Sequence, residues 1–524
     1  MQLFNKKHFW ITILGVFIIE TFSLTAYHFN SSLLSNIGFF VIFFGVLLLS
    51  LRNIEWGVLI AFVDLLVSSF GHLFKLDLGP LQMTMRVGIF FSIQIAYNTM
   101  LITHFLREWT GKYPLFEKLH AFFQKGLHDS VILTSFFKGP YFYPNWAIFA
   151  AIVLGFVMGL VNGNSLRDIF KDMDAYVVFA YFPIMWAGLA SRESRLRLYN
   201  VFAASMSYLA AQTLIVLFIF AHRLQGPMRV LYLWIRDARI GEITLITNDF
   251  YRIFFQSYIY ALVAIFIFAV FFIIQKSTHY KLKEKSDQYI FWLYVISAIM
   301  LLVSFSRSFW FGGAVAVCVF AVALVILKVP WSLIWRGALK MLGGFVVALA
   351  IVIAVVNFPF PKKGPSILIA DLLGNRALSL FGEAAATSRW TLLPILWNEV
   401  MRDPILGSGF GKTITYKTDD PRYLAEDPTG MRKTYAFEWG YLDMWLKMGV
   451  LGLFAFGWLM WRILSIGWLQ LRQSLTPISF GVWLGLIALL GAHFFTPFLN
   501  HPLGIGIIIF AASIFRPEKQ ELRG

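Results

Sequence analysis

The chain of 524 residues has one cysteine and few charged side chains. The single cysteine, Cys318, excludes an intramolecular disulfide, and its position inside an apolar run argues against a thiol-based mechanism. Lys, Arg, Asp and Glu together make up only 14% of the residues, so the chain has no room for a large soluble domain. Nucleic-acid binding would require a basic domain of that kind, and we therefore exclude nucleic acid as a partner.

Apolar residues dominate the amino-acid composition. Hydrophobic residues make up 59% of the chain and the mean hydropathy is +0.71. Runs of roughly 17–25 apolar residues recur, which is the length at which a helix crosses the hydrocarbon core of a bilayer. We predict an all-α polytopic membrane protein with about 14 transmembrane helices. The predicted spans are 10–28, 33–51, 55–74, 86–106, 145–162, 175–190, 199–221, 252–274, 288–305, 309–327, 336–356, 441–462, 479–495 and 500–515.

Basic residues in the connections predict the orientation. If the N-terminus is cytoplasmic, the inner connections hold about twice as many lysines and arginines as the short outer ones. The C-terminus is then cytoplasmic too. One long polar segment, residues 357–439, separates predicted spans 11 and 12 and becomes a large extracytoplasmic loop. Arg252 and Arg307, each at the mouth of a predicted span, face the same side, where we expect the function to lie.

Both arginines are candidates for binding a phosphate group. Arg307 lies in the short connection 304–310 beside Ser306 and Ser308. A guanidinium presents a planar fork of donors, so an arginine among hydroxyls and aromatic rings suits a phosphate or diphosphate. Arg252 opens a predicted span, where a snorkelling arginine at a helix end is the alternative.

Glu438 is the candidate general base. It lies between Phe437 and Trp439, where the long segment re-enters the membrane. We expect these apolar neighbours to raise its pKa and make the carboxylate a usable base. The alternative is an acidic residue favoured by the dipole at a helix N-terminus. His501 is a second candidate base, for which a hydrogen-bonded interfacial histidine is the more ordinary interpretation.

Two other motifs have ordinary structural explanations. The glycine run 407–411 lacks the Lys-Ser/Thr ending of a phosphate loop, so we interpret it as a tight turn. Asp172 and Asp174 resemble the acidic pair with which metal-dependent lipid-linked glycosyltransferases hold a divalent ion. Acidic residues in the first turn of a helix explain them more simply. We therefore predict no metal site and no cofactor.

Residues 250–465 resemble the O-antigen ligase and polymerase superfamily of bacterial envelope glycosyltransferases. The residues that carry this resemblance are Arg252, the turn around Arg307, Ser388-Arg389-Trp390, Asp403-Pro404-Ile405-Leu406-Gly407-Ser408-Gly409, Tyr441-Leu442-Asp443 and Lys447-Met448-Gly449-Val450-Leu451-Gly452. The resemblance implies a GT-C-like bundle in the bacterial inner membrane that moves a glycan from an undecaprenyl-diphosphate carrier without a metal. It divides the chain into an N-terminal bundle, a ligase-like region and C-terminal spans, at residues 1–251, 252–465 and 466–524.

The implied partners are an undecaprenyl-diphosphate-linked oligosaccharide, a glycan or lipid acceptor, and the lipid bilayer. By position, Arg252 and Arg307 match the two arginines thought to hold the donor diphosphate. We assign further substrate contacts to Arg389, Ser306, Ser308 and Tyr441. Ligases of this family carry a histidine before an Asn-x-Tyr-Leu run, and here Glu438 takes its place. This departure leaves both a ligase and a polymerase open.

The expected chemistry follows from charge. Cleavage of the sugar bond builds negative charge on the diphosphate, which fixed guanidinium groups can stabilise. A carboxylate on the opposite side of the anomeric carbon would deprotonate the acceptor hydroxyl, and this single displacement would invert the configuration. The alternative function is a lipid-linked oligosaccharide flippase, which would place cationic residues deep within spans and have two related halves.

Overall fold

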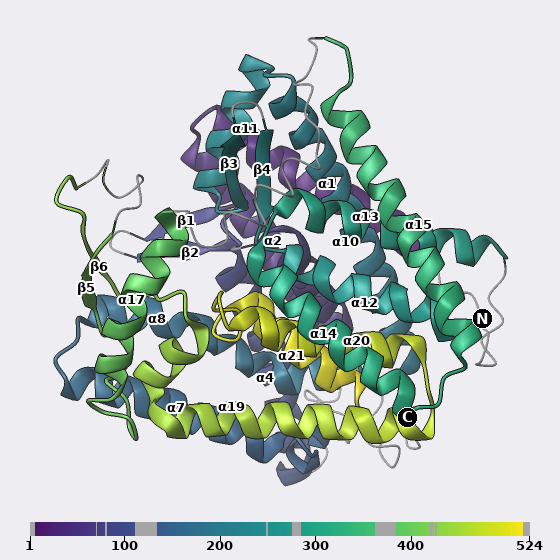
Figure 1. Cartoon of the computed structure of the whole chain (residues 1–524). Helices are drawn as coiled ribbons and strands as arrows, with labels where there is room; N and C mark the ends of the chain where they lie inside the picture. The colour runs from purple at the N-terminus through teal and green to yellow at the C-terminus, as the bar shows by residue number, and fades with distance from the viewer. Residues whose placement is uncertain are drawn as a thin grey trace.

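The computed structural model describes residues 6–69, 71–78, 81–110, 134–247, 250–274, 284–361, 384–418, 424 and 427–516. This part of the chain is a bundle of helices with three short β-hairpins (Figure 1). Nine of its helices are long and apolar enough to cross a membrane. They are α1 (Lys6–His28), α2 (Ser32–Arg52), α4 (Met85–Thr110), α7 (Phe142–Val161), α10 (Arg192–Ala221), α13 (Glu284–Ser304), α14 (Arg307–Ile326), α15 (Trp331–Val356) and α19 (Gly440–Gln473).

Shorter helices complete the bundle and the connections. Those that pack within the bundle are α3 (Ile54–Val67), α9 (Tyr181–Gly188), α12 (Tyr258–Ile274), α20 (Pro477–His493) and α21 (Pro502–Ile514). Those in connections are α8 (Leu166–Met173), α11 (Gln225–Asp237), α17 (Ala384–Val400) and the 3₁₀ helices η1 (Ser135–Lys138) and η2 (Asp174–Ala180). The prediction of an all-α membrane protein is thus confirmed, whereas fourteen transmembrane spans are not.

Helix α20 packs closely against both α12 and α14. Nearly every side chain of α12 is buried, and the sequence of this helix is apolar throughout. Glycines let these helices approach closely: a Cβ at Gly481 would collide with the backbone of Ile267, and one at Gly312 with the carbonyl oxygen of Ala488. Small residues at such contacts are typical of helix packing in membranes, where van der Waals contact drives association.

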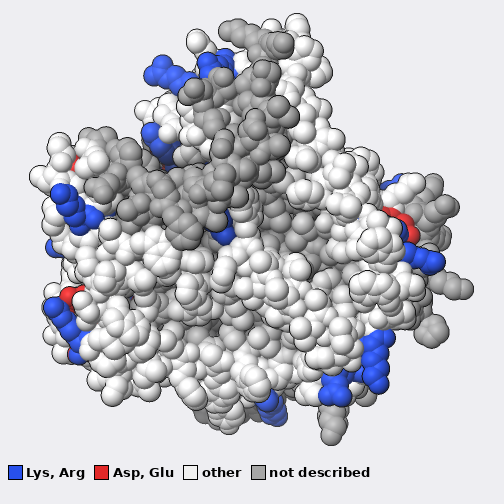
Figure 2. Space-filling view, viewed as in Figure 1, with Lys and Arg blue, Asp and Glu red and all other residues white. Residues whose placement is uncertain are grey.

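The three hairpins lie at one end of the bundle, which we call the polar end. The antiparallel pairs are β1 (Lys75–Leu78) with β2 (Leu81–Thr84), β3 (Gly241–Thr247) with β4 (Phe250–Phe255), and β5 (Ile414–Lys417) with β6 (Met431–Thr434). Figure 1 shows them on the left with α8, α11 and α17. In Figure 2 the charged side chains lie mainly toward two opposite edges of this face, with uncharged surface between them. This pattern suits a bundle that crosses a bilayer between two polar ends.

Three predicted spans are only partly helical. Helix α3 ends at Val67, so the predicted span 55–74 runs on into the loop before β1. The span 175–190 consists of η2 and the eight residues of α9, and the span 252–274 begins in strand β4. Hydropathy records apolar content and not conformation, so it could not separate an apolar strand or 3₁₀ turn from the helix that follows.

Candidate active site

Arg252 contacts the turn at the polar end that leads to Arg307. Strand β4 carries Arg252 opposite Thr244 of β3. The Nε of Arg252 donates a 2.6 Å hydrogen bond to the carbonyl oxygen of Ser304, the last residue of α13. That carbonyl accepts no hydrogen bond within the helix, because the last four carbonyl groups of a helix have no N–H partner in it. Arg307 begins α14 three residues later.

The start of α14 has the features of an anion-binding helix end. Phe305, with a φ of 45°, reverses the chain between α13 and α14. Ser306 occupies the N-cap position, but its side chain does not cap the helix; its Oγ lies 3.0 Å from the Oγ of Ser308 instead. A helix N-terminus carries partial positive charge and outward-pointing N–H groups. Together with the half-buried Arg307, this turn offers hydroxyl, amide and guanidinium donors.

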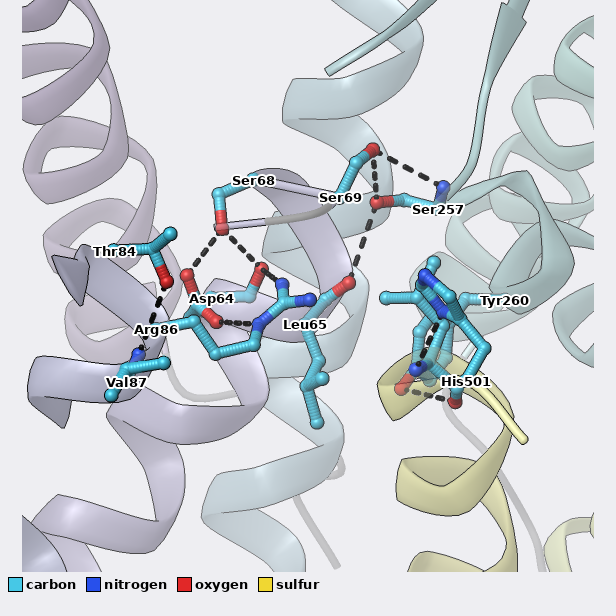
Figure 3. Close-up of polar contacts among 11 residues, drawn as sticks. Asp64, Leu65, Ser68, Ser69, Thr84, Arg86, Val87, Ser257, Tyr260 and His501 are labelled. Atoms are coloured by element: carbon cyan, nitrogen blue, oxygen red, sulfur yellow. Dashed lines mark hydrogen bonds and ion pairs between the residues drawn. The ribbon is translucent and has the colours of Figure 1, made fainter. Parts of the chain in front are cut away.

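Helix α3 holds the strand that carries Arg252 (Figure 3). The hydroxyl of Ser257, which follows β4, lies 3.0 Å from that of Ser69 and donates to the carbonyl of Leu65 at 3.3 Å. Both serine side chains are fully buried. Ser69 adopts a φ of 52°, a conformation that non-glycine residues rarely take and that its surroundings must hold.

A buried ion pair fixes this loop in turn. The Nε of Arg86, at the start of α4, lies 2.6 Å from Oδ2 of Asp64, and the two side chains are 9% and 4% exposed. Arg86 also donates to the Asp64 carbonyl through Nη2 at 3.2 Å (Figure 3). The N-terminal helices therefore support the position of Arg252, a role that the sequence did not indicate.

His501 is the helix cap of α21. Its Nδ1 accepts the N–H of Leu503 at 3.3 Å, and the hydroxyl of Tyr260 donates to the carbonyl of Leu503 at 3.0 Å (Figure 3). This geometry agrees with the ordinary interpretation of a hydrogen-bonded interfacial histidine, and it gives the role of a base no support.

Glu438 stands exposed between two buried aromatic side chains. Phe437 is 2% and Trp439 5% exposed. Helix α19 begins at Gly440 with Trp439 as its N-cap, and the acidic residue of its first turn is Asp443. Glu438 thus precedes the helix, so the alternative in which the dipole favours a first-turn acid fits Asp443 better.

Aromatic rings connect the turn of Glu438 to α14. Trp439 lies 5.7 Å from Phe494 and 5.5 Å from Phe495, between ring centroids. Phe495 in turn lies 5.2 Å from Phe311, one helical turn after Arg307. Trp390 of α17 packs against Trp439 at 5.3 Å. The candidate base and the candidate diphosphate residues are therefore joined through one aromatic cluster at the polar end.

A buried group of three charges lies beneath this turn. The Nζ of Lys447 is 2.5 Å from Oδ1 of Asp172 and 2.6 Å from Oδ1 of Asp443. Sequence reasoning missed this group. The available signal was the spacing of Asp443 and Lys447, one helical turn apart at the start of an apolar span, because ionisable residues within spans are rare and usually paired.

The first-turn interpretation of Asp172 is wrong. Asp172 lies at the end of α8, and its second oxygen accepts the N–H of Gly411 at 3.0 Å. Burial raises the pKa of Asp172, and the ammonium of Lys447 opposes that rise. Asp174 does begin a 3₁₀ helix, η2. In the described part of the chain, no group of three or more His, Cys, Asp or Glu side chains is placed to hold a metal ion.

The glycine run 407–411 forms a turn, as predicted. Its neighbouring segment 404–408 packs into a break in helix α19. Gly449 has a φ of 64° and breaks α19. The carbonyl of Leu446 accepts the N–H of Ser408 at 2.7 Å, and the N–H of Val450 donates to the carbonyl of Pro404 at 2.9 Å. In a regular helix Val450 would donate to Leu446 itself. The segment 404–408 thus replaces the missing helical hydrogen bond.

Two predicted substrate-binding residues remain. The hydroxyl of Tyr441 donates to the carbonyl of Leu490 at 2.9 Å, and its ring packs edge-on against His493, which ties α19 to α20. This contact is structural, so a substrate role for Tyr441 stays a prediction. Arg389 lies in α17, and its side chain falls outside the described residues.

Comparison with protein-family models matches residues 292–457 to the O-antigen ligase family (Wzy_C: O-Antigen ligase). No curated protein and no solved structure matches the chain. The matched residues include Arg307, Glu438 and Lys447, whereas Arg252 and Asp172 lie outside them. The candidate site therefore combines the matched region with helices and strands from the rest of the chain.

Proposed function

We propose that the chain moves a glycan from a polyprenyl-diphosphate carrier to an acceptor hydroxyl, because residues 292–457 match the O-antigen ligase family and the described residues include helices long and apolar enough to cross a membrane. The donor would be an undecaprenyl-diphosphate-linked oligosaccharide, and the acceptor a glycan or a lipid. The reaction would take place on the extracytoplasmic face of a bacterial inner membrane, where the polar end would lie.

The observation that carries this proposal is the contact of Arg252 with the turn that leads to Arg307 at the start of α14. The leaving diphosphate gains negative charge as the sugar bond breaks. Two guanidinium groups, the N-terminus of a 20-residue helix and the hydroxyls of Ser306 and Ser308 would face that charge. Donors that are fixed before the reaction stabilise developing charge without reorganisation. In this scheme the transfer needs no metal ion.

Glu438 would act as the general base. Its exposed carboxylate is held between two anchored aromatic residues, which suits an encounter with an acceptor hydroxyl. The acceptor oxygen would lose its proton to Glu438 as it attacks the anomeric carbon, and the diphosphate would leave on the opposite side toward Arg307. This single displacement inverts the anomeric configuration.

The test is a reconstituted transfer reaction. Purified protein in detergent is given a defined undecaprenyl-diphosphate-linked oligosaccharide, with and without a lipid A-type acceptor, and the products are separated by mass. We expect release of undecaprenyl diphosphate together with either a glycosylated acceptor or a longer glycan. These two products distinguish a ligase from a polymerase. An unchanged donor, moved intact across vesicle membranes in a parallel assay, would contradict the proposal and support a flippase.

A further inference from the structure

Lys447 joins three segments of the chain. Its side chain is 2% exposed and lies between the carboxylates of Asp172 and Asp443. The second oxygen of Asp172 accepts the N–H of Gly411 at 3.0 Å, and that of Asp443 accepts the side-chain amide of Asn500 at 2.6 Å. The three charged residues of this group thus join α8, the glycine run 407–411, and the connection between α20 and α21.

The three charged residues are connected to Glu438 through Phe437, the residue that precedes it in the chain. The Nζ of Lys447 lies 5.8 Å from the ring centroid of Phe437, within the range of a cation–π contact. The backbone of Phe437 also lies near the carboxylate of Asp443. Phe437 is buried and Glu438, the next residue, is exposed. A shift of Lys447 would therefore move the backbone from which the Glu438 side chain projects.

Stability alone does not account for this arrangement. Burying charges is costly, and a buried ion pair often stabilises no more than apolar residues of the same volume. Here one lysine faces two buried carboxyl groups. What the group does provide is a defined position, because it ties α8, Gly411 and Asn500 to helix α19.

We infer that the Asp172–Lys447–Asp443 group positions Glu438 for proton transfer, with Lys447 as a positioning residue that acts through Phe437. This inference rests on the proposed function, in which Glu438 is the base. It assigns a role to Asp172, which lies on α8 outside the matched region.

The kinetic test uses Lys447→Met in the reconstituted transfer reaction. We expect kcat to fall about a hundredfold, the size of effect that a misplaced catalytic group produces, with the KM for the donor unchanged. Lys412→Met is the matched control: Lys412 pairs with Glu399 at 3.2 Å at the same polar end, and its loss should leave kcat unchanged.

A second variant and a structural readout guard against a folding defect. Phe437→Leu keeps all three charges and removes only the contact between the lysine and the ring. A spin label on a cysteine at the exposed position Ala436, in a Cys318→Ser background, reports the mobility of the turn. We expect greater mobility and a lower kcat in Phe437→Leu, and no change of mobility in Lys412→Met.

The outcomes separate the inference from the proposed function. Unchanged mobility and kcat in Phe437→Leu, or an unchanged kcat in Lys447→Met, would overturn the inference while the transfer reaction stands. Full activity of Glu438→Gln would overturn the assignment of the base and, with it, the inference. Absence of transfer by the unaltered protein would overturn the proposed function.

Discussion

Arg252 donates a 2.6 Å hydrogen bond to the carbonyl oxygen of Ser304, so a residue of strand β4 closes the end of helix α13. The guanidinium also packs 4.7 Å from the ring centroid of Phe254. Because the chain turns directly from Ser304 to Arg307, the positions of the two arginines depend on each other. A change at either one should alter what both can bind.

We expect Arg307→Ala to lower the rate of glycan transfer by about 10²–10³, the typical cost of removing one fixed donor to a developing charge. Arg307→Lys should recover only part of the rate, since an ammonium cannot reproduce the bidentate fork. The measurement is kcat on a defined lipid-linked donor. Arg229→Ala, on the exposed face of α11, is the control and should be unaffected. Full activity of Arg307→Ala would remove this arginine from the site.

Arg252→Ala should reduce transfer by a similar factor, but the double variant should lose less than the product of the two single effects. Residues that act in one network are not additive. Additive losses would show that Arg252 and Arg307 contact the substrate independently. Activity in the presence of EDTA should persist, and a strict requirement for a divalent ion would contradict the metal-free scheme.

Glu438→Gln should abolish transfer and leave donor binding intact, because an amide cannot accept the proton while the arginines are untouched. Glu438→His should retain some activity, with the acid limb of the pH profile moved to higher pH. A free imidazole titrates near pH 6.5 and a free glutamate near 4.3. As the pH falls, the histidine therefore becomes protonated, and stops acting as a base, at a higher pH than the glutamate. A fully active Glu438→Gln enzyme would show that Glu438 has no role in proton transfer.

The orientation of the polar end can be tested by thiol labelling in a Cys318→Ser background. A cysteine at the exposed Thr415 on β5 should react with an impermeant reagent in intact spheroplasts. One at the exposed Lys328, between α14 and α15, should react only after the membrane is opened. The reverse labelling pattern would overturn the predicted topology as a whole.

The break in α19 makes a prediction about two glycines of one helix. Gly449→Ala should lower the thermal unfolding temperature in detergent, because a Cβ there would collide with the carbonyl of Ile405. Its backbone conformation, with φ 64° and ψ −173°, alone costs a residue with a side chain about 1–3 kcal/mol. Gly457→Ala meets no atom within 4 Å and should stabilise the helix by up to about 1 kcal/mol. Equal melting temperatures for the two variants would contradict the insertion of segment 404–408.

The sequence predicted the helices well where one apolar run forms one helix, as in α14 and α15. It failed where an apolar run changes conformation, as at Arg252, whose strand reads like the start of a span. Residues close in sequence, such as Ser306, Arg307 and Ser308, could be assigned together because the chain itself joins them.

The rest of the site depends on long-range contacts that spacing does not record. Asp172 and Lys447 meet from distant parts of the chain, and so do Asp64 and Arg86 on the two sides of a hairpin. A buried charge in an apolar run indicates that a partner exists, but not which residue it is. That is why Asp172 was assigned to a helix dipole when it belongs to an ion pair.

The insertion of segment 404–408 into α19 also bears on how the protein is made. Until that segment docks, the carbonyl of Leu446 and the amide of Val450 lack their partners at the break. A bilayer offers no water to satisfy them, so this part of α19 is costly to insert by itself. We therefore expect the helix and the segment that precedes it in the chain to dock against each other as this region enters the bilayer.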